Sequence, residues 1–236
     1  SNNKPLFIDA HLDRLFHSAS VMRLSITSTK EEIKKCVATL IEKNNIPNSG
    51  IRLIIAGGDA PDGYTITQPH LLIIQQPLDP PPTTLSSKGI QLVSYFYQRQ
   101  LAEVKTTDYL MAIHLQPWMK SQGADDILYY NNDSVCECPR SNIFMVTYDN
   151  IIVTPTRNML KGITRKNIIQ VAATQNWKLE QRDISLEEMK TAKEVFISSS
   201  TKRIIPVKGL DEQNFSLNLD NSISAQIFNH LLALEN

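Results

Sequence analysis

The sequence has no excess charge of either sign and little cysteine. Its 24 Lys and Arg residues balance 24 Asp and Glu residues, giving a formal net charge of zero. A neutral chain lacks the electrostatic signature of proteins that bind nucleic acid or a membrane surface. We therefore expect a small-molecule partner and expect the protein to bind neither nucleic acid nor a membrane. The three cysteines, Cys36, Cys136 and Cys138, are an odd number with no disulfide-framework spacing, which favours a reducing, cytoplasmic location. No apolar run approaches the ~20 residues of a spanning helix.

Several motifs that report specific chemistry are also missing. The sequence contains no GxGxxG, GxxxxGK[ST], HExxH or GxSxG, so dinucleotide, P-loop, zincin and α/β-hydrolase chemistry have no local support. Cys136 and Cys138 form only a CxC pair, which supplies two thiols. Because a structural metal site needs more ligands than this, we expect no metal.

What is present is enough apolar material for a sizeable core, at 42% of 236 residues. Apolar spacing predicts helices over 8–22 and from a Thr29–Glu32 capping box to about residue 41. Strands are expected at 51–56 and 71–75, with a glycine-rich loop between them. The segment DPPPTTLSSKG at 79–89 can continue neither a helix nor a central strand, and we expect a domain boundary there.

The remainder of the sequence predicts a β-rich part that also contains helices. Short apolar runs separated by turn residues predict strands, listed by number as 91–98, 126–130, 134–138, 142–147, 151–154, 194–199 and 204–207. Helical spacing predicts helices at 107–119, 164–175 and 223–234. The sequence thus indicates an α/β (α+β) fold.

Four separated segments together resemble the class IV aminotransferase family, the pyridoxal-phosphate enzymes of fold type IV. They are HLDRLFHSA, EVKTTDYL, VCECPRSNIF continuing to TPTRNMLKGITR, and EVFISSSTKRIIPV. The resemblance implies two domains: a smaller N-terminal α/β domain at 1–83, without the family's first strand, and a larger cofactor-binding domain of mixed β structure with helices at 84–236. Family members include branched-chain and D-amino-acid aminotransferases and aminodeoxychorismate lyase.

The chemistry of pyridoxal 5'-phosphate implies catalytic roles for two residues in these segments, Lys105 and Glu137. The cofactor needs a lysine for a Schiff base and a carboxylate that keeps its ring nitrogen protonated. Lys105 matches the family's lysine, and we expect partial burial there. Glu137 matches the carboxylate and lies in a predicted apolar strand, where a pyridinium N–H would be a suitable partner.

The phosphate of the cofactor needs an anion-binding cradle. Ile163 and Thr164 follow Gly162 at the start of a predicted helix, where free N–H groups and the positive dipole end face an anion. The ordinary alternative is a helix N-cap formed by Thr164. The resemblance adds Arg14 and Ser200 as phosphate ligands.

The resemblance also assigns Arg52, Thr201 and Tyr109 to substrate binding. The tyrosine that accompanies the arginine in branched-chain members is replaced by Gly50, and the arginine-and-histidine loop of D-amino-acid members is not recognisable. The sequence therefore predicts an aminotransferase acting on an amino acid and a 2-oxo acid, with aminodeoxychorismate lyase and a non-catalytic homologue as alternatives. The family implies a homodimer, and a small first domain would gain stability from a partner.

Overall fold

The computed structural model describes residues 5–132, 134–217 and 219–235. The chain divides into two compact units. The first consists of Ser1–Pro80 and Val104–Thr106, and the second of Pro81–Glu103 and Thr107–Asn236. The three residues around Lys105 therefore group with the first unit, although they follow the proline-rich segment in the sequence.

The first unit contains two helices and a β-hairpin, each close to its predicted position. They are α1 (Ile8–Val21), α2 (Lys30–Asn44), β1 (Ser49–Ala56) and β2 (His70–Pro77). The capping box at the start of α2 is confirmed: the Glu32 N–H donates to Thr29 Oγ1 at 3.2 Å, and the Thr29 N–H donates to the Glu32 carboxylate at 2.7 Å. These reciprocal bonds satisfy two donors that a helix start otherwise leaves unpaired.

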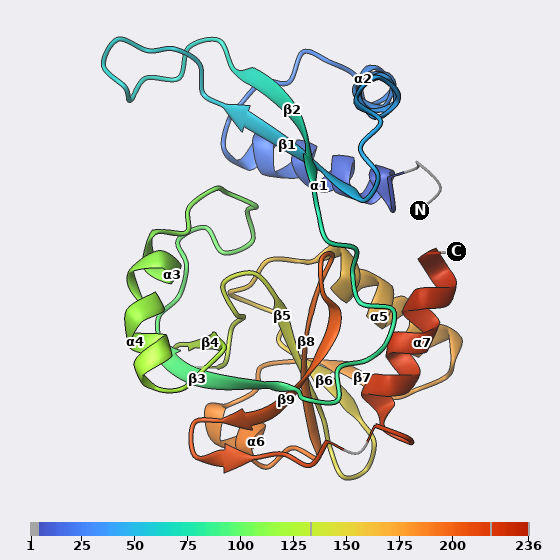
Figure 1. Cartoon of the computed structure of the whole chain (residues 1–236). Coiled ribbons are helices and arrows are strands. Elements are labelled where there is room, and N and C mark those ends of the chain that lie inside the picture. The colour runs from blue at the N-terminus through green and yellow to red at the C-terminus, as the bar shows by residue number, and fades with distance from the viewer. Residues whose placement is uncertain (1–4, 133, 218, 236) are drawn as a thin grey trace. The chain divides into compact units, whose positions relative to one another are not determined.

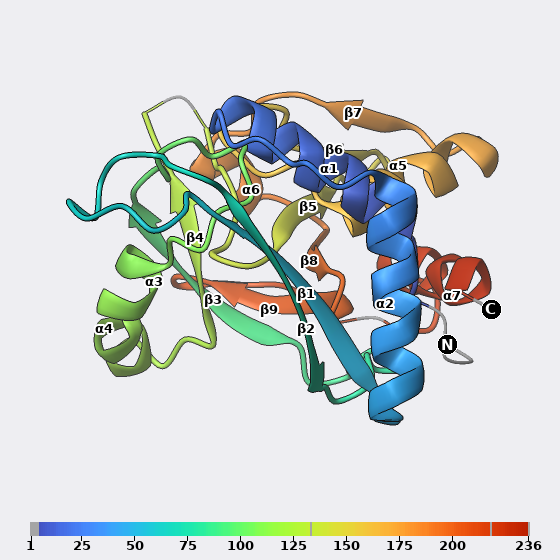
Figure 2. The same ribbon diagram turned by 90° about the horizontal axis from the view of Figure 1, so that it is seen from above.

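One face of this hairpin packs on the helices, as the view from above shows for α2 (Figure 2). The core combines Leu12, Ile33 and Val37 with alternate strand residues such as Leu53 and Ile73. On the intervening positions Leu72 is 43% exposed and Ile74 is 39% exposed. The antiparallel β1–β2 pair therefore carries apolar side chains on both faces, of which the helices cover one.

The second unit is built on an eight-stranded mixed sheet in the described part of the chain (Figure 1). The strand order is β4-β3-β9-β8-β5-β6-β7, with β10 paired to β9. In chain order the strands are β3 (Ile90–Phe96), β4 (Asp126–Tyr130), β5 (Asn142–Val146), β6 (Ile152–Thr154), β7 (Leu179–Gln181), β8 (Glu194–Ser199), β9 (Arg203–Leu210) and β10 (Gln213–Asn214). β3 runs parallel to both of its neighbours, whereas β8 is antiparallel to β5 and β9.

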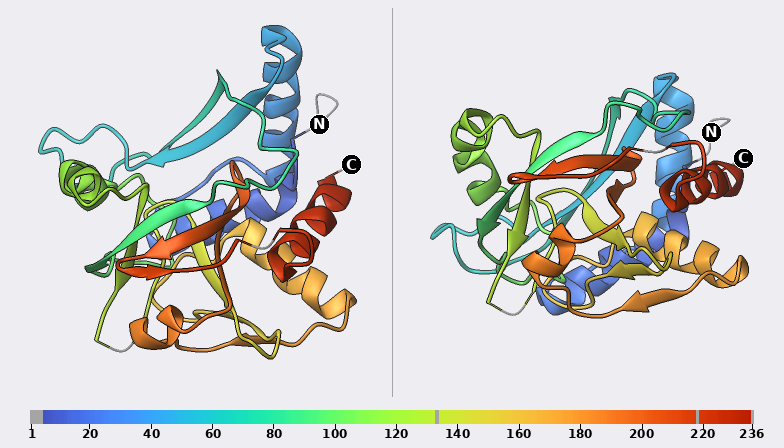
Figure 3. Two further views of the ribbon diagram at one scale, coloured as in Figure 1. Left: turned by 60° about the horizontal axis from the view of Figure 1, so that its bottom comes forward. Right: turned by 90° about the horizontal axis from the view of Figure 1, so that it is seen from below.

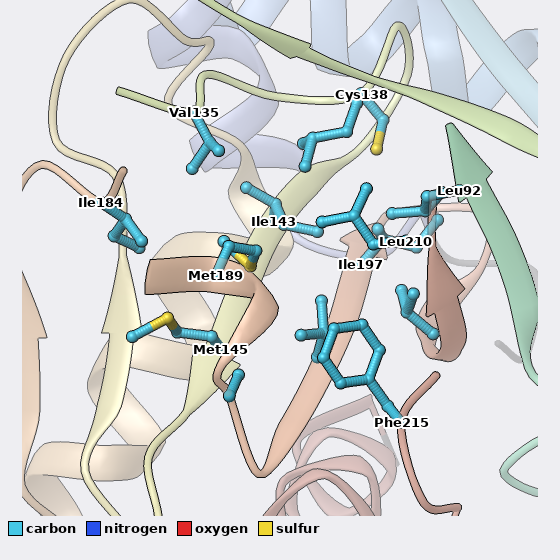
Figure 4. Packing of buried hydrophobic residues seen from close by; sticks show 14 of the residues in the cluster. Leu92, Val135, Cys138, Ile143, Met145, Ile184, Met189, Ile197, Leu210 and Phe215 are labelled. Carbon is cyan, nitrogen blue, oxygen red and sulfur yellow. The ribbon is translucent and has the colours of Figure 1, made fainter. Parts of the chain in front are cut away.

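The central strands β5 and β8 are buried on both faces, which explains their continuous apolar sequences. Ile143 and Ile197 belong to one hydrophobic cluster, seen in close-up in Figure 4. Phe144 and Phe196 belong to a second cluster on the opposite face, where their rings stack with centroids 4.9 Å apart. Helices α5 (Ile163–Thr174) and α7 (Ile223–Glu235) lie side by side and contribute to this second cluster (Figure 3).

Two sequence predictions in this unit are wrong. The helix expected over 107–119 is split into α3 (Leu110–His114) and α4 (Gln116–Ser121). Pro117 lies in the first turn of α4, where its missing N–H costs nothing but stops a continuous helix. The strand expected over 134–138 is an irregular extended segment, held by isolated bridges from Val135 to Tyr130 and from Cys138 to Ser141. Short α6 (Leu186–Lys190) was not predicted.

No helix in the described residues is long and apolar enough to cross a membrane.

Candidate active site

Glu137 is a buried carboxylate held by hydrogen-bond donors on both of its oxygens. The residue is 4% exposed. Nε and one terminal nitrogen of Arg99 lie 2.7 Å from its Oε1, and the backbone N–H of Leu160 donates to its Oε2 at 3.0 Å. Burial is thus offset by an ion pair and a backbone hydrogen bond. Arg99 was not identified from the sequence, because its distance of 38 residues from Glu137 forms no local pattern.

Asn142 connects this carboxylate to the start of α5. The peptide of Leu160 donates to Glu137 through its N–H and accepts from Asn142 Nδ2 at 2.7 Å through its carbonyl. Asn142 also crowds Gly162, since a Cβ built on that glycine would lie 2.2 Å from Asn142 Oδ1. The acid and the predicted phosphate cradle are therefore linked by consecutive contacts within one unit. Asn142 was missed, although it stands in the SNIF part of the motif.

The N-terminus of α5 has no side-chain cap. Gly162 is the N-cap residue, with extended backbone angles, so the alternative in which Thr164 caps the helix is excluded. Ile163 and Thr164 are the first two helical residues. Their N–H groups have no partner within the helix and are suited to bind an anion.

Three buried serine hydroxyls without hydrogen-bond partners in the described structure lie at neighbouring strand ends. They are Ser141 Oγ, beside the start of β5, and Ser198 Oγ and Ser199 Oγ at the end of β8. Asn142 and Ser198 are paired across these two strands. Unsatisfied buried hydroxyls are rare, so these oxygens and N–H groups fit a ligand with several polar atoms.

Ser200 and Thr201 occupy the exposed turn between β8 and β9, directly after these serines. The Lys202 N–H donates to the Ser199 carbonyl at 3.2 Å and closes the turn. The structure therefore brings Ser200 and Thr201 to the same end of the sheet as the start of β5.

Tyr109 lies near Arg99 in the second unit. Together with Arg99, Tyr97, Tyr129 and Pro139 it lines a small pocket. Tyr129 is 1% exposed and its hydroxyl has no partner in the described structure. Burial, followed by the effect of Tyr97, raises the pKa of Tyr129 well above its ordinary value, so this hydroxyl stays protonated at neutral pH.

In the first unit, the segment carrying Lys105 is attached to α1. The backbone N–H of Lys105 donates to the hydroxyl of Ser18 at 3.2 Å, and Ser18 is 6% exposed. Contrary to the sequence expectation, Lys105 is itself exposed. Its backbone is fixed while its side chain remains accessible.

His11 marks a concentration of positive charge in this unit. Burial and then the charges of Arg14 and Lys105 lower the pKa of His11 from 6.5 to about 4. The imidazole is therefore neutral at physiological pH, and Arg14 and Lys105 are close enough to act on it together. His11 is the first residue of the HLDRL motif. Its place in this motif was the sequence signal that could have marked it as a residue of the candidate site.

The remaining predicted substrate residue is Arg52. It is exposed on β1, opposite Ile74 of β2, on the hairpin face that the helices do not cover.

The described residues contain no group of three or more His, Cys, Asp or Glu side chains arranged to hold a metal ion. The three cysteines are free. Burial and then the neighbouring Glu137 carboxylate raise the pKa of Cys136 to about 12, which keeps its thiol protonated. A protonated thiol is a poor metal ligand.

Comparison with known proteins identifies the family. The model of the class IV amino-transferases matches residues 1–210. The chain belongs to the class IV aminotransferase family. Members depend on pyridoxal 5'-phosphate and are aminotransferases or lyases. The family resemblance stated from the sequence and the predicted fold class are both confirmed.

Three similar proteins cover different activities. A D-alanine aminotransferase of Staphylococcus epidermidis is 25% identical over 96% of this chain and 82% of its own. A putative 4-amino-4-deoxychorismate lyase from Legionella pneumophila superposes with a TM-score of 0.88 and 25% identity, over 99% of this chain and 87% of that one. A branched-chain amino acid aminotransferase from Escherichia coli has a TM-score of 0.83 and 23% identity over 96% of this chain and 78% of its own.

The residues present fit the family's cofactor. The uncapped start of α5 offers N–H donors to a phosphate, and the buried carboxylate of Glu137 can accept a hydrogen bond from a pyridinium nitrogen. The partnerless hydroxyls of Ser141, Ser198 and Ser199 offer further polar contacts.

Proposed function

We propose that this protein is a pyridoxal-phosphate-dependent aminotransferase that moves an amino group between an amino acid and a 2-oxo acid. The main structural support for this proposal is the series of contacts from Glu137 through Leu160 and Asn142 to the start of α5. This series joins a buried acid to an uncapped helix N-terminus. When bound, the cofactor supplies an electron sink next to the substrate Cα.

In this proposal each of the predicted site residues has its own role. The N–H groups of Ile163 and Thr164, with Ser200, bind the phosphate, and Arg14 adds a guanidinium. Glu137 stabilises a proton on the ring nitrogen. The amine of Lys105 would hold the cofactor and would move the proton at the substrate Cα.

Substrate recognition belongs to the same proposal. Thr201 follows the phosphate-binding turn and can contact a substrate carboxylate. Tyr109 lies in the pocket beside Arg99, near Glu137. Arg52 is an exposed cation on β1, available to a carboxylate.

The first experiment tests covalent attachment. Purified protein incubated with pyridoxal 5'-phosphate should develop a visible absorption band, and borohydride should fix the cofactor on the Lys105 peptide in a mass-spectrometric map. Lys105→Ala should lose this label, while Lys120→Ala, at an exposed position of α4, serves as a control. Labelling of another lysine in the Lys105→Ala variant would contradict the assignment. Absence of cofactor uptake would favour a non-catalytic homologue.

The second experiment separates the two enzymatic reactions. The likeness to the Legionella protein supports aminodeoxychorismate lyase as the alternative. A lyase releases pyruvate from aminodeoxychorismate without a 2-oxo acid acceptor, whereas an aminotransferase forms a keto acid only when both an amino donor and an acceptor are supplied. Parallel assays with and without acceptor distinguish them.

We also propose a cytoplasmic homodimer. The two-stranded β1–β2 sheet leaves Leu72 and Ile74 exposed, and covering them would stabilise the first unit. Three free cysteines are compatible with a reducing compartment. Sedimentation at low micromolar concentration should give twice the 26.7 kDa chain mass, and a fully active monomer would contradict this proposal.

A further inference from the structure

Arg165 is a buried cation whose hydrogen-bond partners are all neutral. The residue is 6% exposed. Its Nε lies 3.4 Å from Thr154 Oγ1, and its Nη2 donates to the Pro155 carbonyl at 2.8 Å and to Gln181 Oε1 at 3.1 Å. These partners orient the guanidinium but do not neutralise it.

The other arginines of this unit that are buried or partly buried next to a carboxylate are paired with it. Arg203 is 9% exposed and lies 2.6 Å from a carboxylate oxygen of Glu235, and Arg99 is paired with Glu137. Within the described residues, Arg165 forms no such ion pair, and burial lowers the pKa of its guanidinium. Buried charges in proteins are normally paired, because desolvation of an isolated ion is costly.

The position of Arg165 on its helix makes this charge more unusual. It is the third residue of α5, and the first turn contains no acidic side chain. A cation near a helix N-terminus is disfavoured by the helix dipole, which already places positive charge there. Arg165 and the uncapped N–H groups therefore concentrate positive potential at the same helix end.

This arrangement becomes favourable when an anion binds at that end. Successive helical residues rise about 1.5 Å, so Arg165 begins within one turn of Ile163 and Thr164. Its guanidinium is directed to Thr154, Pro155 and Gln181. Arg165 can thus attract an anion electrostatically without a direct hydrogen bond, while its own hydrogen bonds hold the guanidinium in place.

We propose that Arg165 is a positioning residue that supplies the buried counter-charge for the phosphate of the bound cofactor. The inference rests on the proposed function, because it takes pyridoxal 5'-phosphate as the anion at the start of α5. It assigns Arg165 an electrostatic role in phosphate affinity that its neutral hydrogen-bond partners do not explain.

The test compares pyridoxal 5'-phosphate with pyridoxal, which differs only in lacking the phosphate. Cofactor-depleted wild-type protein, Arg165→Met and Arg165→Lys are titrated with each compound by absorbance. Arg165→Met should weaken binding of the phosphorylated compound by on the order of 10-fold or more, with less than about 3-fold change for pyridoxal. Arg165→Lys should retain most of the preference because it keeps the charge.

Gln181→Leu is the matched control. It removes a neutral partner of Arg165 but leaves the charge in place, so the preference for the phosphorylated compound should remain close to wild type. Equal weakening of both compounds in Arg165→Met would assign Arg165 a purely structural role and overturn the proposal. The proposal would also be overturned if Gln181→Leu lost the preference for the phosphorylated compound as fully as Arg165→Met does.

A second measurement does not depend on the folding of Arg165→Met. In ³¹P NMR of the wild-type complex, a buried counter-charge should hold the second pKa of the cofactor phosphate below its value in free cofactor, and Arg165→Lys should preserve this shift. An unshifted phosphate titration in the wild type would contradict the inference. Failure of the proposed function is recognised separately, as phosphate-dependent binding without covalent attachment to Lys105.

Discussion

Arg99 and Glu137 form a buried ion pair in which the Arg99 Nε and Glu137 Oε1 are 2.7 Å apart. The guanidinium also donates to the Ala102 carbonyl at 2.6 Å, so it is held on both sides. Together with the Leu160 N–H on the other carboxylate oxygen, this arrangement fixes the orientation of the Glu137 carboxylate.

Removing Arg99 should therefore destabilise the protein strongly. Arg99→Met leaves the Glu137 charge buried without its cationic partner, which typically costs about 3–5 kcal/mol of unfolding free energy. Urea denaturation would measure the loss. The double variant Arg99→Met/Glu137→Gln should recover part of it, because the stranded charge is gone. A single variant as stable as wild type would show that the pair is energetically unimportant.

The bond between Lys105 and Ser18 leads to a second prediction. Ser18→Ala removes the acceptor of the Lys105 backbone N–H and should cost about 1 kcal/mol of stability. Because that bond fixes the lysine-bearing segment, borohydride-trappable attachment of cofactor to Lys105 should also be slower. Ser20→Ala, on an exposed position of the same helix, is the control and should change neither quantity.

The close approach of Gly162 and Asn142 leads to a third prediction. The backbone angles of Gly162 are ordinary, so the constraint is space rather than conformation. Gly162→Ala would force Asn142 from its bond to Leu160 and weaken affinity for pyridoxal 5'-phosphate by on the order of 10-fold. Gly57→Ala, whose added Cβ would meet its neighbours at an ordinary 3.9 Å, should bind normally. Equal affinities in the two variants would contradict this steric argument.

The buried imidazole of His11 predicts a loss of stability in mild acid. Its pKa is about 4 in the folded protein and 6.5 ordinarily, so the unfolded chain binds the extra proton first as the pH falls. Stability should be fully present above pH 6.5 and decline towards pH 4, by up to about 3 kcal/mol. Chemical denaturation across this range measures the effect. His11→Asn should show a flatter profile between these two pH values, and an identical profile would exclude His11 as the origin.

The sequence predicted elements whose patterns are local. The capping box at Thr29 and the continuous apolar runs of β5 and β8 depend on residues a few positions apart, and both are reflected in the structure. The predicted helix over 107–119 was wrong because Pro117 cannot continue a helix, although the apolar spacing on both sides of it is helical. The predicted strand over 134–138 was wrong because isolated bridges replace a regular ladder, which composition does not reveal.

The candidate site was predictable to the extent that its residues occupy motifs. Glu137, Ile163 and Thr164 were proposed from such segments, and contacts through Leu160 and Asn142 connect them. The Arg99 partner of Glu137 was not predictable, because tertiary folding alone brings it near. The exposure of Lys105 was also missed. Its place between a predicted strand and a predicted helix suggested partial burial, whereas the buried residue is its neighbour Val104.

The path of the chain between the units limits how this protein can exchange parts with its relatives. The chain leaves the first unit after Pro80, returns for Val104–Thr106 and leaves again. A recombination event at the proline-rich segment would combine α1 from one parent with the lysine segment from another. Since Ser18 of α1 binds the Lys105 backbone, these two segments must remain mutually compatible, and we expect them to be inherited together.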